Sequence, residues 1–70
     1  MQEITDIHEL GTLIRQKRKA QGLTQEDFAD IAGVGTRVVS EIERGKQTAE
    51  VGKVLLLAKL AGVKLYTEDV

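Results

Sequence analysis

The sequence predicts an all-α fold of four to five short helices, followed by a short C-terminal β-strand. Apolar residues recur at helical spacing in successive stretches of the chain. Residues able to cap a helix precede several of these stretches, and glycines follow them. The last residues alternate apolar and polar instead, which is the period of a strand. We therefore expect residues 1–62 to form a helical domain and residues 63–70 to form a strand or tail.

The first helix is predicted to begin near Ile7. Asp6 can cap it, and Glu9 stands three residues later, as in a capping box. Gly22 should end this helix. Its buried stripe is expected to contain Ile7, Leu10 and Ile14, with Leu13 beside it.

Residues 23–45 are predicted to form two short helices joined by a tight turn. Thr24 can cap the helix near 25–32, and Asp27 can return the hydrogen bond of a capping box. Gly45 can end the helix near 36–44 in the left-handed conformation. The apolar positions of this pair are Phe28, Ala29, Ala32, Val39 and Ile42. Small residues at the contact and a turn containing glycine are typical of a helix-turn-helix motif.

The last helix is predicted near 49–61, with Thr48 as its cap. Its expected core stripe contains Val51, Val54, Leu55, Ala58 and Ala61. Leu56, Leu57 and Leu60 extend the apolar surface around the helix, and a helix that is apolar over most of its circumference is buried on more than one face. We interpret this second face as a homodimer contact. The alternative is one thick core with Leu56 exposed.

The segment after Gly62 places Val63, Leu65 and Thr67 on one side of a strand. A single strand cannot satisfy its own backbone, so its hydrogen-bonding partner must come from another molecule. The same segment of a second subunit, paired antiparallel across a two-fold axis, is the symmetric solution. The alternative is a disordered tail. The residues predicted to form the dimer contact are Leu56, Leu60, Val63, Leu65 and Tyr66.

Length and composition exclude several kinds of protein. A chain of 70 residues buries only about 60% of its unfolded surface, so a single copy would be marginally stable. It has no cysteine and one histidine, which argues against disulfides, metal clusters and cofactors. A second subunit is then the simplest source of added stability. Neither a membrane span nor a signal peptide is visible, so we expect a soluble cytoplasmic protein. No motif points to an enzyme, so we do not expect catalysis.

The net charge is −1, but the charges are unevenly distributed. Acids gather toward both ends of the chain, whereas basic residues gather at Arg15, Lys17, Arg18, Lys19, Arg37, Arg44 and Lys46. A slightly acidic domain can bind nucleic acid if its basic residues share one face. Its binding to DNA of unrelated sequence would then be weaker than that of a strongly basic domain.

The runs GLTQEDFA and GVGTRVVSEIERG resemble the phage-repressor/Cro-like (XRE-type) helix-turn-helix family. The resemblance covers roughly residues 9–63 and implies a repressor-like DNA-binding domain. The strand-like residues that directly follow Gly62 resemble the HipB-like antitoxins, whose C-terminal strands pair between subunits. This implies a homodimer that binds a palindromic operator, represses its own operon and partners a HipA-like serine/threonine kinase toxin. The alternatives are a stand-alone XRE-type regulator, or a protein-interaction module that uses Ile31 and the leucines of the last helix.

The resemblance implies that the second helix of the motif enters the major groove of DNA. Arg37 is the strongest candidate there, because its guanidinium can bond guanine O6 and N7 together. The alternative for Arg37 is a phosphate contact or a solvated side chain. The base-reading positions implied are Gly35, Thr36, Arg37, Ser40 and Glu41. The positions implied to contact phosphates are Gln25, Arg44, Lys46, Gln47, Arg15 and Lys19.

The sequence also departs from the family pattern. Gly35 stands where a polar residue is usual, while Val38 and Ile31 are apolar at positions that are usually polar. The exposed character expected for Ile31 suggests a contact outside the core. The resemblance further implies a partly buried ion pair between Arg18 and Glu43 that orients the recognition helix.

Overall fold

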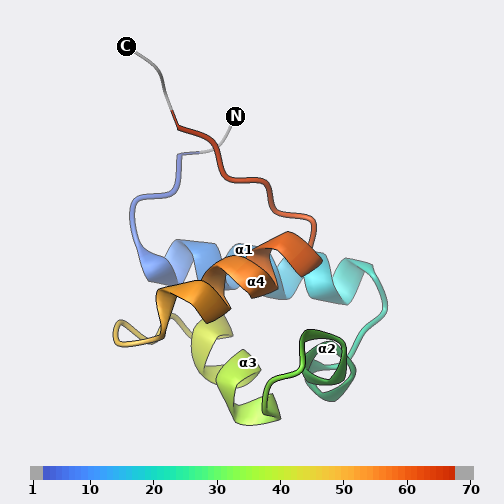
Figure 1. Cartoon of the computed structure of the whole chain (residues 1–70). Coiled ribbons are helices and arrows are strands. Elements are labelled where there is room, and N and C mark those ends of the chain that lie inside the picture. The colour runs from blue at the N-terminus through green and yellow to red at the C-terminus, as the bar shows by residue number, and fades with distance from the viewer. Residues whose placement is uncertain (1–2, 68–70) are drawn as a thin grey trace.

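The computed structural model describes residues 3–67 and contains four helices in this range. They are α1 (Ile7–Ala20), α2 (Gln25–Ala32), α3 (Thr36–Glu43) and α4 (Val51–Leu60). In Figure 1, α4 crosses the face of α1, and α2 and α3 lie together below them. The all-α prediction is confirmed.

The first two helices begin where their capping residues predict. The Asp6 side chain accepts a hydrogen bond from the backbone N–H of Glu9 at 2.8 Å, and α1 starts at the next residue, Ile7. Thr24 and Asp27 exchange both bonds of a capping box, at 3.0 and 3.1 Å. These reciprocal bonds satisfy two backbone N–H groups that a helix start leaves without a partner.

The last helix begins later than the sequence predicts. Its N-cap residue is Glu50, which makes no side-chain capping bond, so the prediction that Thr48 caps this helix is wrong. The backbone N–H of Ala49 instead donates to the carbonyl of Lys46 at 3.2 Å, which closes a turn before the helix. Residues 46–49 are thus used in the loop after α3.

The core lies where all four helices meet, and its largest fully buried side chains are Ile14, Phe28, Val39, Ile42 and Leu57. The predicted apolar stripe of α4 needs correction. Leu57 is in the core and not on a second face, whereas Val51 and Leu55 are 70% and 48% exposed. The buried positions of this helix and its cap are Val54, Leu57, Ala58 and Ala61. They repeat at helical spacing, and Leu55 falls just outside that stripe.

Val63 belongs to the same core. Its backbone N–H donates to the carbonyl of Ala58 at 2.8 Å, in the bond that closes a Schellman motif, and its side chain is only 9% exposed. Leu60 also packs against the core. Val63 and Leu60, both predicted to lie in the dimer contact, therefore pack mainly inside their own domain.

The predicted C-terminal strand is not formed between residues 63 and 67, which continue away from α4 as irregular chain (Figure 1). The physical reason is the one anticipated from the sequence, since one strand has no backbone partner within a single copy. Residues 68–70 of the predicted strand lie outside the described range.

Gly11 sets the distance between α1 and α3. This residue is buried, and a side chain at its position would press against the Ile42 carbonyl and lie 2.9 Å from that of Glu43. Only a residue without a Cβ permits this approach. The C-terminal turn of α3 can consequently rest directly on the backbone of α1.

Candidate nucleic-acid interface

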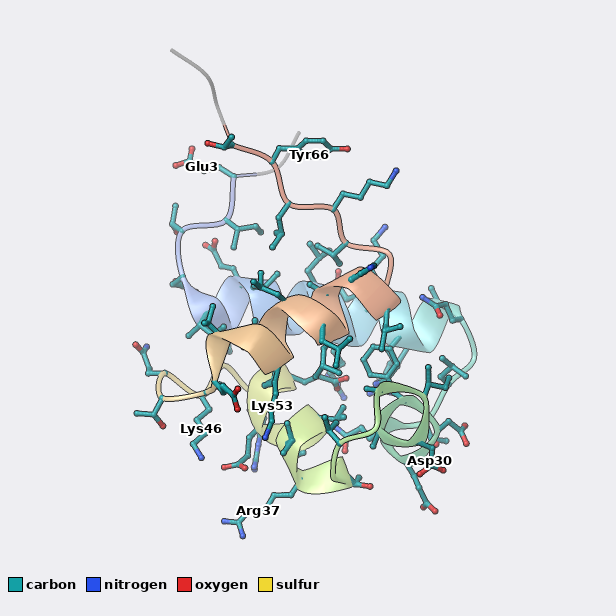
Figure 2. The ribbon with its side chains drawn as sticks, viewed as in Figure 1. Glu3, Asp30, Arg37, Lys46, Lys53 and Tyr66 are labelled. Atoms are coloured by element: carbon teal, nitrogen blue, oxygen red, sulfur yellow. The ribbon has the colours of Figure 1, made fainter. Side chains whose placement is uncertain are left out.

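The two sides of α3 have opposite character. Val39, Ile42 and Glu43 are buried against the rest of the domain. On the other side Thr36 and Arg37 are exposed, and Ser40 and Glu41 are half-buried. The Arg37 side chain is 89% exposed and points away from the domain at the bottom of Figure 2. The predicted base-reading residues therefore share one accessible face of α3.

Gly35 is the N-cap residue of α3 and supplies no side-chain capping bond. Apart from its two chain neighbours, no residue in the described part of the chain has an atom within 4 Å of the position that a Cβ would take there. The first turn of α3 is thus open, and its backbone at Gly35 is exposed.

A buried ion pair holds α3 against α1. Arg18 donates from Nε to Glu43 Oε2 at 2.7 Å and from Nη2 to Glu43 Oε1 at 2.9 Å. Its third bond goes from Nη1 to the carbonyl of Leu23 at 2.7 Å. The two side chains are only 6% and 1% exposed. The hydrogen bond to Glu43 raises the pKa of Arg18. The direct contact that the resemblance implies is present as two hydrogen bonds between the charged groups.

Gln25 joins this network from the first turn of α2. Its Nε2 donates to Glu43 Oε1 at 3.2 Å, so the carboxylate receives bonds from both α1 and α2. Helices α1 and α2 are thereby tied to the C-terminal end of α3. The network fixes how the exposed face of α3 is presented.

Glu41 is engaged by two basic residues. Lys46 Nζ lies 2.7 Å from Glu41 Oε2, and Arg37 Nε lies 3.7 Å from Oε1. The hydrogen bond from Lys46, together with the charges of Lys46, Arg37 and Arg44, lowers the pKa of Glu41. The sequence interpretation missed these contacts, although the spacing of Arg37 and Glu41 at i and i+4 is a known signal for an ion pair on a helix.

A shallow hollow follows the C-terminal end of α3. It has a volume of about 420 Å³ and is lined by Glu41, Arg44, Gly45, Lys46 and Gln47. The structure thus brings together three of the predicted phosphate-contacting residues at one end of the α3 face. Arg15 and Lys19 are exposed on α1 and line no part of this hollow.

His8 has no role in the sequence interpretation, but it supports the loop after α3. Its Nδ1 lies 3.4 Å from the carbonyl oxygen of Arg44. Gly45 has a φ of 83°, and a Cβ there would lie 2.7 Å from the Cα of His8. No local pattern could have revealed this contact, because His8 and Arg44 are 36 residues apart.

Two other kinds of site are not found in the described part of the chain. Among residues 3–67, no group of three or more His, Cys, Asp or Glu side chains is placed to hold a metal ion. No helix in the same span is both long and apolar enough to cross a membrane.

Two short helices joined by a tight glycine turn, with the second helix exposed on one face, define a helix-turn-helix protein. The chain belongs to the helix-turn-helix family, which matches residues 14–67. Membership of this family of regulators confirms the XRE/Cro-like resemblance and shows that the chain is not an enzyme.

Two curated relatives are similar over most of the chain. An uncharacterized HTH-type transcriptional regulator of Sinorhizobium fredii is 42% identical over 57 residues, which cover 81% of this chain and 75% of the relative. An uncharacterized HTH-type transcriptional regulator of Methanothermobacter thermautotrophicus is 34% identical over 59 residues, which cover 84% of each chain.

Proposed function

We propose that the protein is a sequence-specific DNA-binding transcriptional repressor that acts in the cytoplasm as a homodimer on a palindromic operator. The observation that carries the proposal is the exposed face of α3, held in place by the buried contacts of Glu43. A recognition helix must be rigidly presented, because hydrogen bonds to base edges tolerate little misalignment. The names of both relatives support a role in transcription.

In this proposal the residues that contact DNA divide into two groups. Arg37 reads a guanine through its guanidinium, Thr36 and Ser40 offer hydroxyls, and Gly35 presents its backbone. Glu41 shares this face, but its carboxylate must release Lys46 before it can accept a hydrogen bond from a cytosine amino group. The residues proposed to contact phosphates are Gln25, Arg44, Lys46, Gln47, Arg15 and Lys19.

Replacing Arg37 with alanine should weaken binding to the operator by about 5- to 150-fold, the equivalent of roughly 1–3 kcal/mol for one lost bidentate contact. The measurement is fluorescence anisotropy with a duplex from upstream of the chain's own gene, beside a random-sequence duplex of equal length. Lys17→Ala removes the same charge from an exposed position on α1 and serves as the control. Operator binding that is unchanged by Arg37→Ala would contradict the assignment.

The homodimer is proposed on the exposed apolar residues near the end of α4. Leu55 and Leu56 on the helix and Leu65 and Tyr66 on the following segment are all exposed. A groove of about 540 Å³ lies between these two segments, with Leu55, Val63 and Leu65 among its lining residues. Apolar side chains grouped on so small a domain are better explained by a partner than by solvent. The antiparallel pairing of residues 63–70 with the second copy belongs to the same proposal.

Leu65→Asp and Leu56→Asp separate the two possible contacts, because one lies on the C-terminal segment and the other on α4. Burying a leucine contributes about 1.5–3 kcal/mol, so loss of a true contact should raise the dimer dissociation constant at least tenfold. Sedimentation velocity over a concentration series measures this constant. Ile31→Asp changes another exposed apolar residue, on α2, and should leave association unaltered. A full-length chain that sediments as a monomer would refute the dimer.

The finer proposal is that the protein is a HipB-like antitoxin that represses its own operon and binds a HipA-like kinase toxin. The resemblance of the segment after Gly62 supports it, together with the exposed Leu65 and Tyr66 in that segment. Copurification of a kinase with the tagged chain from its native cells tests the proposal. Recovery of the repressor without any kinase would favour a stand-alone regulator.

The exposed Ile31 is what favours the remaining alternative, a module that binds another protein.

A further inference from the structure

We infer that Glu41 is a built-in countercharge that limits binding of the α3 face to DNA of unrelated sequence. This inference rests on the proposed function, since it concerns the regulation of the same surface. It assigns Glu41 a role in setting the affinity for DNA, and this role does not require contact with a base.

The position of the carboxylate is the first support. One Glu41 oxygen lies 2.7 Å from Lys46 Nζ and the other lies 3.7 Å from Arg37 Nε. Both of these basic residues are proposed to contact DNA. The carboxylate therefore gives both cations an anionic partner before any DNA is bound.

The surroundings of this acid are the second support. Glu41 lines the same hollow as Arg44, Lys46 and Gln47, which are proposed to contact phosphates. Its side chain is 21% exposed, compared with 46% for Lys46 and 89% for Arg37. The acid is thus covered more than its partners, which are accessible to an approaching anion.

The consequence follows from electrostatics. To contact DNA, Lys46 and Arg37 must exchange a carboxylate for phosphate or base groups, so the net stabilisation from each is small. The carboxylate also stays close to the duplex and repels its phosphates. These costs fall equally on every DNA sequence. Base contacts made at the operator, such as those of Arg37, can offset them, whereas unrelated DNA offers no such compensation.

The test is Glu41→Gln, measured against a random-sequence 20-bp duplex by anisotropy at several salt concentrations. Loss of two exposed ion pairs should raise this affinity about two- to tenfold near 0.1 M salt. The log–log salt dependence should steepen by about 0.9 for each additional phosphate that the variant neutralises. Glu3→Gln removes the same charge at the opposite end of the molecule (Figure 2) and should change neither quantity.

A double-mutant cycle with Lys46→Gln tests the specific pairing. If Glu41 restrains Lys46, the increase in affinity from Glu41→Gln should shrink in the Lys46→Gln background. Additive effects would mean that Glu41 acts only through overall charge, and would overturn the inference. An unchanged affinity for the random duplex would also overturn it.

Two further outcomes keep this inference separate from the proposed function. Weaker binding of Glu41→Gln to the operator alone, with random DNA unaffected, would make Glu41 a base reader and overturn the countercharge. Failure of the unaltered protein to bind any duplex in a salt-dependent manner would overturn the proposed function and the countercharge together. Circular dichroism of each variant checks that the helices are retained.

Discussion

Replacing Glu43 with glutamine is expected to destabilise the fold by about 3–5 kcal/mol, the largest effect that we expect from a single substitution in this protein. The change keeps the size of the side chain but leaves the buried guanidinium of Arg18 without its counterion. Domains of this size are commonly stable by only about 0.05–0.15 kcal/mol per residue. The variant should therefore lose a large part of the stability of the domain. Urea unfolding followed by far-UV circular dichroism gives the free energy difference.

Two companion variants establish that burial is the cause. Glu50→Gln removes one partner of the exposed Lys53–Glu50 pair, at 3.5 Å, and should change stability by less than about 0.5 kcal/mol. Replacing Arg18 and Glu43 together with methionine and leucine removes both charges and should recover much of the loss. A Glu43→Gln variant as stable as Glu50→Gln would contradict the importance of the buried pair.

The second large effect is expected for Gly11→Ala. Alanine favours a helix over glycine by about 1 kcal/mol, so an exposed position would become more stable. At position 11 the added methyl group would press on the carbonyls of Ile42 and Glu43, and these are backbone atoms that cannot rotate away. The added methyl group should push α1 away from α3. As in other overpacked cores, this should destabilise the fold by about 1–3 kcal/mol more than the improved helix propensity stabilises it. A lower midpoint of thermal unfolding is the expected result.

Gly52→Ala is the matched control for this prediction. Gly52 is also in a helix, but the nearest atom to its added Cβ would be a Glu50 side-chain oxygen at 3.8 Å. We expect this variant to be as stable as the unaltered protein, or more stable by up to about 1 kcal/mol. If Gly11→Ala and Gly52→Ala changed the stability in the same direction, the contact at Gly11 would not be decisive.

The sequence predicts helix positions best where capping is local. Thr24 and Asp27 are three residues apart, and they place the start of α2 correctly. Thr48 has the same chemistry but does not cap α4, because a turn bond between Lys46 and Ala49 fixes the preceding loop. The alternating pattern predicts a strand at Val63. The combination of Gly62 with a following apolar residue is equally a signal for a Schellman motif, and the structure has the latter.

The sequence also predicts part of the candidate site, as it predicts part of the fold. The resemblance to repressors identifies Arg18 and Glu43, which no local pattern would join across 25 residues. The exposed face of α3 follows from its apolar spacing. The contacts of Glu41 with Lys46, and of His8 with Arg44, depend on how the loop after α3 folds back. Tertiary contacts of this kind leave little trace in a single sequence.

The burial of Val63 has a mechanical consequence for the C-terminal segment. Because this residue is anchored, the chain beyond it starts from a fixed point on the domain surface. Residues 64–67 can extend by no more than roughly 14 Å, at about 3.5 Å per residue. A molecule bound by these residues therefore stays close to the domain. Its distance from α3 would be set by the rigid arrangement of the helices.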